Sequence, residues 1–163
     1  MLNTCSDISV VMPVWRGDSP DQIAAAIYSV LEQTLQPTEF VVVADGPVSS
    51  DIDACLAHHS ERGEITLLRL PENIGRGGAR NHAINATTGQ LVAIMDADDV
   101  CRPTRLAQQL DFVKRHNVDV LGGLISEFDQ VVGDNISIRK VPQNHESICR
   151  MLKCRSAFNH VTL

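Results

Sequence analysis

The chain has 163 residues, a formal net charge of −6, 44% hydrophobic and 21% charged residues, which is typical of one globular domain with a sizeable core. The negative charge excludes a general nucleic-acid binder, so a phosphate-bearing ligand would need local cations or a metal. The five cysteines show no CxxC or zinc-like spacing, and their odd number favours reduced thiols in a cytoplasmic setting. Because no basic region precedes a long apolar run, we expect a soluble protein without a signal peptide or membrane span.

Short apolar runs alternate with segments of helical periodicity along most of the chain. Strands are predicted over 8–14, 39–44, 64–70 and 90–96, followed by a strand at 118–128 that could pair with 130–140 as a hairpin. Helices are predicted over 19–34, 50–62, 73–89, 103–116 and 145–153. Ser19 or Asp21 can cap the first helix, Gly89 suits the exit of the third, and Pro103 fits the first turn of the fourth.

Runs of Val, Ile and Leu separated by amphipathic helices predict an α/β fold with a mostly parallel sheet and helices on both faces. We expect residues 1–163 to form a single domain. In such sheets ligands bind outside the carboxyl ends of the strands. The four strand exits read PVWRGD, ADGPVSSD, PENIGRGGAR and DADD, and we expect them to converge.

The DADD segment contains two candidate metal ligands. Asp96 and Asp98 are two residues apart, so a strictly extended strand would place both on one face. Two such carboxylates repel unless they are protonated or neutralised, and Mg²⁺ or Mn²⁺ prefers carboxylates together with phosphate oxygens. A solvated acidic turn is the alternative, and spacing alone leaves both interpretations open.

The other exits offer candidate ligand contacts, each with a simpler structural alternative. Gly75, with the two glycines after it, lets a backbone approach a ligand, and Arg76 and Arg80 are phosphate donors, unless this is only a surface loop. Asp45 could accept a hydrogen bond from a nucleobase, or form an Asx turn. Trp15 could line a base or sugar pocket, or simply pack.

Two further patterns are uninformative or negative. The spacing of the glycines is not GxGxxG, which argues against a nicotinamide enzyme. The histidines show no HxxxH or HExxH pattern, and we expect His58, His59 and His116 on helix surfaces without a role.

With these motifs in order, the chain resembles the family 2 glycosyltransferases, which have the GT-A fold. The resemblance extends from about residue 8 to residue 106 and rests on four segments, ISVVMPVW, SVLEQTLQPTEFVVVADG, ENIGRGGARNHAINATTGQLVAIMDADDVCRP and RL. Four motifs in this order are far more specific than any one of them.

The resemblance implies that a nucleotide-diphosphate-sugar, most often a UDP-sugar, is bound at the strand ends. It implies that Mg²⁺ or Mn²⁺ is held by Asp98 and Asp96, with Asp99 in support. Contacts to the nucleotide-sugar are implied for Pro13, Val14, Trp15, Asp45, Gly75, Arg80, Asp96 and Ala97. Similar enzymes transfer the sugar with inversion to the hydroxyl of a saccharide or glycolipid, in polysaccharide or glycoconjugate biosynthesis. No nucleic-acid partner is implied, and membrane association is expected only through the acceptor or through segments missing from this sequence.

The sequence departs from the family pattern in two places. Ala44 stands where an acidic residue often precedes Asp45. No segment matches the downstream acidic motif that supplies the general base, and none of Glu127, Asp129 and Asp134 is a convincing candidate. We therefore expect a donor-binding fragment of a longer enzyme, with the catalytic base absent and the fragment itself inactive.

Three other classes of protein are alternatives to a glycosyltransferase. A phosphoacceptor receiver domain needs an acidic pair after the first strand and a lysine after the fifth, and neither is present. A nucleotidyltransferase needs a glycine-rich opening after the first strand, which is also missing. A non-catalytic nucleotide-sugar-binding module of GT-A fold remains an alternative.

Overall fold

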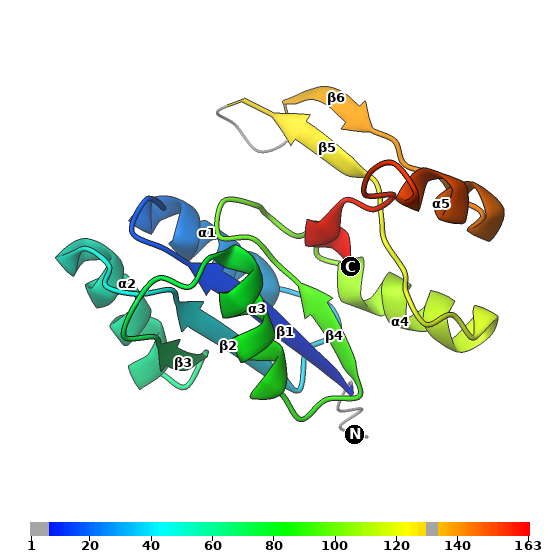
Figure 1. Cartoon of the computed structure of the whole chain (residues 1–163). Coiled ribbons are helices and arrows are strands. Elements are labelled where there is room, and N and C mark those ends of the chain that lie inside the picture. The colour runs from blue at the N-terminus through cyan, green and yellow to red at the C-terminus, as the bar shows by residue number, and fades with distance from the viewer. Residues whose placement is uncertain (1–6, 130–133) are drawn as a thin grey trace, which may run out of the picture. The chain divides into compact units, whose positions relative to one another are not determined.

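The computed structural model describes residues 7–129 and 134–163 (Figure 1). The chain divides into two compact units, with the boundary between Phe112 and Val113. The expectation of a single domain therefore stays a prediction. Among the described residues, no helix combines the length and the apolar character needed to cross a bilayer.

The first unit is built on a four-stranded parallel sheet of order β3-β2-β1-β4. Its strands are β1 (Ile8–Val14), β2 (Glu39–Ala44), β3 (Thr66–Arg69) and β4 (Leu91–Ile94). The connecting helices are α1 (Pro20–Leu31), α2 (Ser50–Glu61) and α3 (Arg76–Asn85), and α4 (Arg105–His116) follows β4. The predicted parallel α/β architecture is confirmed, with β1 and β2 at the predicted residues.

Both faces of the sheet are covered. Successive side chains of β1 and β2 point to opposite faces, and each face carries apolar residues that must be buried. One face of β1 carries Ile8, Val10, Met12 and Val14, which share a core with the buried sides of α1 and α2. The opposite face carries Val11, and the small buried residues of α3, Ala79 and Ala83, let that helix contact β1 and β2 closely. Figure 1 shows α3 in front of these two strands.

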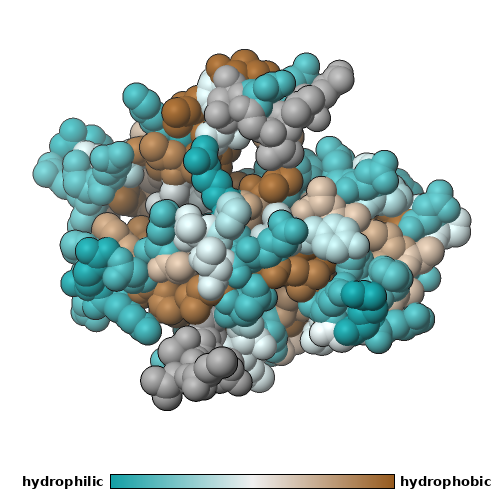
Figure 2. Space-filling model, turned by 180° about the vertical axis from the view of Figure 1, so that it is seen from behind, coloured by the Kyte–Doolittle hydropathy of each residue, from teal (hydrophilic) through white to brown (hydrophobic). Residues whose placement is uncertain are grey.

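Seen from the side opposite to α3, the surface mixes hydrophilic and hydrophobic side chains (Figure 2). Among the described residues of the first unit, the large apolar ones that are exposed are Trp15, Tyr28, Ile74, Val100 and Phe112. Trp15 differs from the others because it stands at the end of a central strand.

The second unit contains a two-stranded antiparallel sheet of β5 (Ile125–Phe128) and β6 (Asn135–Arg139). A helix, α5 (His145–Leu152), and a 3-10 turn, η1 (His160–Thr162), follow it. The predicted hairpin pairing is confirmed, although residues 130–133 lie outside the described residues.

The strand predicted over 118–128 is mostly wrong, because only its last four residues are extended. The backbone of Gly123 bonds to side chains of the segment around η1 instead of to a strand. Its N–H donates to Thr162 Oγ1 at 2.7 Å, and its carbonyl accepts from Asn159 Nδ2 at 3.1 Å. Tertiary hydrogen bonds therefore satisfy this backbone without a sheet.

Three smaller predictions also need correction. Ser19 is the N-cap residue of α1, but its side chain makes no capping hydrogen bond. Pro103 precedes α4 rather than entering its first turn, because its carbonyl accepts from Thr34 N at 2.8 Å. His59 is buried rather than on a helix surface, and its Nδ1 lies 2.6 Å from Glu64 Oε2.

Candidate functional site

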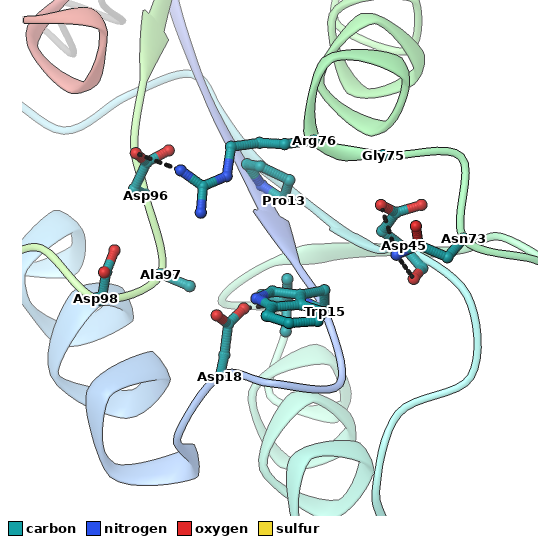
Figure 3. Close-up of a pocket in the computed structure, with 11 residues that line it drawn as sticks. Pro13, Trp15, Asp18, Asp45, Asn73, Gly75, Arg76, Asp96, Ala97 and Asp98 are labelled. Atoms are coloured by element: carbon teal, nitrogen blue, oxygen red, sulfur yellow. Dashed lines mark hydrogen bonds and ion pairs between the residues drawn. The ribbon is translucent and has the colours of Figure 1, made fainter.

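The strand exits of the first unit line a cleft of about 200 Å³, shown in Figure 3. Because β1, β2 and β4 are parallel, their carboxyl ends meet at one edge of the sheet, and the N-terminus of α3 faces the same edge. The residues that line the cleft are Pro13, Val14, Trp15, Asp18, Asp45, Asn73, Gly75, Arg76, Asp96, Ala97 and Asp98. The predicted convergence of the strand exits is therefore observed.

The exit of β1 presents an aromatic ring to the cleft. The Trp15 side chain is 44% exposed and packs over Gly17, where an added Cβ would lie 2.3 Å from a ring carbon. The Trp15 backbone N–H donates to Asp18 Oδ2 at 2.9 Å, which closes a tight turn before α1. This turn keeps a flat apolar surface at the cleft, suited to packing against a base or a sugar.

The exit of β2 is tied to the segment before α3 through Asp45. This side chain is 3% exposed, and its carboxylate accepts from Ile74 N at 2.8 Å and Asn73 Nδ2 at 3.0 Å. Gly46 makes the approach possible, because it has a φ of +82° and an added Cβ would lie 2.6 Å from Asn73 N. Asp45 therefore makes a long-range contact instead of the Asx turn considered from sequence.

The aspartate cluster after β4 is formed by a turn, not by an extended strand. β4 ends at Ile94, and Asp99 N donates to Asp96 O at 3.3 Å. The predicted strand thus ends two residues earlier than expected, and the extended geometry that would place Asp96 and Asp98 on one face is not formed. The turn nevertheless brings carboxylate oxygens of Asp96, Asp98 and Asp99 within 4.8 Å of one another.

Two arginines of α3 neutralise the buried member of this cluster. Arg80 Nη2 lies 2.8 Å from Asp96 Oδ1, and Arg76 Nη1 lies 3.8 Å from Asp96 Oδ2. Asp96 is 7% exposed, and burying an unpaired charge would be costly, so these arginines compensate the buried carboxylate. Arg80 lies outside the set of described residues that line the cleft, so it contacts the site through Asp96.

The carboxylate of Asp18 lines the same cleft as Asp98 and is affected by its negative charge. Burial raises the pKa of the Asp18 carboxyl above its ordinary value, although the hydrogen bond from Trp15 N–H opposes this effect. The charge of Asp98 raises the pKa further, and Arg76 lowers it. A cation entering the cleft would relieve this repulsion.

The donor set of the cluster fits a hard divalent cation. Three carboxylates supply oxygen ligands close enough for one ion, and Asp98 is exposed while Asp99 is partly exposed. Mg²⁺ and Mn²⁺ bind few carboxylates and keep positions for phosphate oxygens and water. Asp96 shares its oxygens with both arginines, whereas Asp98 is exposed.

Buried polar side chains fasten the aspartate turn to α1. Gln33 donates from Nε2 to Arg102 O at 2.8 Å and accepts at Oε1 from Leu106 N at 3.0 Å. Ser29 Oγ accepts from Cys101 N at 3.1 Å. These hydrogen bonds thus fix both ends of the short loop that follows the aspartates.

Asp18 and Asn73 line the cleft but were not predicted from the sequence, whereas Arg76 was predicted as a phosphate donor. The two missed residues lie in the strand exits PVWRGD and PENIGRGGAR, and their polar character within these exits is the signal that points to them. Gln33 gave no such signal, because its partners are about 70 residues away in the chain.

Comparison with known proteins decides the family. The model of Glycosyl transferase family 2 matches residues 9–161. This chain belongs to that family. The match extends well beyond the segments that suggested the resemblance, because it continues through the second unit.

Among curated relatives, an uncharacterized glycosyltransferase of Haemophilus influenzae is 32% identical, covering 95% of this chain and 58% of that protein. A UDP-Gal:alpha-D-GlcNAc-diphosphoundecaprenol beta-1,3-galactosyltransferase of Escherichia coli is 34% identical, covering 93% of this chain and 55% of that protein. The amylovoran biosynthesis glycosyltransferase AmsE of Erwinia amylovora is 29% identical, over 94% of this chain and 57% of that protein. The family 2 chain thus spans little more than half the length of these relatives.

Solved structures agree with the GT-A fold. TarS of S. aureus superposes with a TM-score of 0.62 at 26% identity, covering 71% of this chain and 21% of that chain. The mannosyltransferase PcManGT of Pyrobaculum calidifontis, in complex with GDP-Man and Mn²⁺, has a TM-score of 0.60 at 22% identity, covering 78% and 37%. At 22% identity, the likeness to PcManGT concerns the fold alone.

Proposed function

We propose that the protein containing this chain transfers a sugar from a nucleotide-diphosphate-sugar to an acceptor hydroxyl, in polysaccharide or glycoconjugate biosynthesis. The observation that supports this most is the meeting of Trp15, Asp45 and the aspartate cluster on one cleft at the carboxyl edge of the sheet. These are an apolar surface for a nucleoside, a polar acceptor and a set of hard oxygen ligands. UDP is the favoured nucleotide, because the E. coli relative is named for a UDP-sugar.

The side chains of the cleft divide between nucleoside and diphosphate. Pro13, Val14 and Trp15 form an apolar wall against which a base or ribose can pack. Asp45 can still accept from a base N–H, because each carboxylate oxygen has a second acceptor position beside its bond to Asn73 or Ile74. Ala97 and Gly75 leave room for the ligand near the aspartates.

Asp98 and Asp96, with Asp99, would hold Mg²⁺ or Mn²⁺. When bound, the ion neutralises charge on the departing nucleoside diphosphate, which is the Lewis-acid role of metals in such sites. Arg80 orients Asp96 through its 2.8 Å contact with Oδ1. We propose that the acceptor attacks with inversion of the anomeric carbon, assisted by a general base.

The acceptor is proposed to be a saccharide or glycolipid hydroxyl. No sequence segment matches the family's acidic base motif, so we propose that the 163-residue chain binds the donor but transfers sugar feebly by itself. Robust transfer by this chain, measured with UDP-sugars and a lipid-linked saccharide, would contradict that part of the proposal.

The test is thermal unfolding of the chain with UDP, GDP and dTDP at millimolar concentration, each with and without Mn²⁺. Binding to the native state alone must stabilise it, and a ligand at about 100 times its Kd should raise Tm by roughly 5 to 10 °C in a chain of this size. We expect the largest rise with UDP and Mn²⁺ together. An unchanged Tm with every nucleotide would overturn the proposed donor site.

A further inference from the structure

The charge of the cleft is poorly matched to a diphosphate ligand. Four aspartates line it, namely Asp18, Asp45, Asp96 and Asp98, whereas Arg76 is the one cation among the described residues that line it. A nucleoside diphosphate entering such a cleft meets carboxylates on several sides, and like charges at short range are strongly unfavourable. Arg76 is therefore placed where an anionic ligand most needs a positive group of the protein.

Arg76 and Arg80 contact the same carboxylate in different ways. The Arg80 side chain is 17% exposed and makes a 2.8 Å ion pair with Asp96 Oδ1. The Arg76 side chain is 57% exposed, and its ion pair with Asp96 Oδ2 is long, at 3.8 Å. Because an exposed ion pair contributes little to stability, Arg76 can leave Asp96 at small cost, whereas Arg80 cannot.

The backbone around Arg76 leaves space for a ligand. An added Cβ at Gly75 or Gly77 would find no atom within 4 Å, so the start of α3 is open on this side. Gly75 also has a φ of +84°, which lets the chain turn sharply into the helix. Figure 3 shows the Arg76 side chain extending from the start of α3 past Pro13 toward Asp96.

We propose that Arg76 recognises the diphosphate of the donor, exchanging its long contact with Asp96 for hydrogen bonds to phosphate oxygens. This inference rests on the proposed function and names the group that reads the anionic part of the ligand. A guanidinium can donate two parallel N–H groups to a phosphate, which a single ammonium cannot match. The same movement removes the contact of Arg76 with Asp96 Oδ2, which lies in the aspartate cluster, so nucleotide and cation binding should favour each other.

The test uses Trp15, the single tryptophan of the chain, which lines the cleft and is therefore a fluorescence reporter of ligand binding. UDP, GDP and uridine are titrated into the wild-type chain, Arg76→Gln and Arg76→Lys. Arg69→Gln is the matched control, because Arg69 is 46% exposed and its 2.8 Å ion pair with Asp53 lies outside the lining of the cleft. Thermal unfolding of each variant shows whether it folds.

We expect Arg76→Gln to weaken binding of the preferred diphosphate by about 10-fold or more, with uridine binding and Tm unchanged. Arg76→Lys should retain part of the affinity, and Arg69→Gln all of it. Equal diphosphate affinity of Arg76→Gln and wild type would overturn the inference while the proposed donor site stands. Equal losses for UDP and uridine would also overturn it, because Arg76 would then shape the cleft. A wild-type chain that binds neither UDP nor GDP would overturn the donor site and this inference together.

Discussion

The carboxylate of Asp45, at the end of β2, accepts a hydrogen bond of 2.8 Å from the backbone N–H of Ile74, which lies 29 residues later in the chain. The same side chain also binds Asn73. Together these bonds fasten the segment that leads into α3 to the middle of the sheet. The positions of Gly75 and Arg76 at the cleft therefore depend on Asp45, whether or not Asp45 also contacts the ligand.

Replacing Asp45 should lower the stability of the first unit. Asp45→Ala leaves the Ile74 N–H and the Asn73 amide without their acceptor, and we expect the free energy of unfolding to fall by about 2 to 3 kcal/mol. Asp45→Asn keeps one acceptor oxygen, so it should cost less, about 1 kcal/mol. Urea denaturation at pH 7 measures both. Equal stability of Asp45→Ala and wild type would show that these hydrogen bonds do not stabilise the loop.

Asp98 is expected to be the most metal-specific of the aspartates. Asp98→Asn removes an exposed ligand charge without breaking an internal ion pair, so the free protein should keep its Tm within about 1 °C. The additional rise in Tm caused by Mn²⁺ in the presence of UDP should disappear. Asp51→Asn, an exposed substitution at the start of α2, is the control and should respond like wild type. A full Mn²⁺ response in Asp98→Asn would exclude Asp98 as a ligand.

Gln33 should stabilise the turn behind the aspartates more than its neighbour Gln36 does. Gln33→Leu removes the contacts to Arg102 O and Leu106 N, which join the segment after α1 to the start of α4. We expect a loss of about 2 to 3 kcal/mol in unfolding free energy and weaker Mn²⁺ binding.

Gln36→Leu is the matched control for this substitution. Gln36 is exposed, and its Nε2 donates to two nearby carbonyls of the same helix exit, those of Leu31 and Gln33. Because water can replace those bonds, the loss should stay below about 1 kcal/mol. Similar losses in the two variants, measured by urea denaturation, would contradict the role assigned to Gln33.

Glu39 lies at the amino end of the sheet and should make the free energy of unfolding depend on pH in the acidic range. Partial burial alone would raise the pKa of its carboxyl, but hydrogen bonds from the Thr88 N–H, Ser9 Oγ, Thr88 Oγ1 and the Gly89 N–H lower it below the ordinary 4.5. The native state therefore binds this proton less readily than the unfolded state. The stabilisation is complete above pH 4.5 and is lost as the pH falls through the lowered value.

The measurement is the free energy of unfolding of wild type and Glu39→Gln from pH 7 down to pH 3. Wild type should lose more stability than the variant over this range, so the difference between them should shrink as the pH falls. Parallel curves for the two proteins would contradict the assignment to Glu39.

Local sequence patterns determined the alternation of strands and helices and the identity of the strand exits. A run such as Phe40 to Ala44 is apolar because it is buried on both faces, and that requirement is visible in the sequence alone. The family motifs have the same local character. The sequence was therefore sufficient to indicate a parallel α/β fold and to place Trp15, Asp45 and Asp98 at one edge.

Only the tertiary structure decided which of these side chains are partners. Asp96 pairs with Arg80 across 16 residues of chain, and Gln33 binds Leu106 N across 73. The spacing of Asp96 and Asp98 suggested one face of a strand, yet pairing with β1 stops at Ile94 and a turn brings the carboxylates together. The physical reason is that hydrogen-bond partners are selected by how the elements pack, whereas sequence periodicity records only which face of each element is buried.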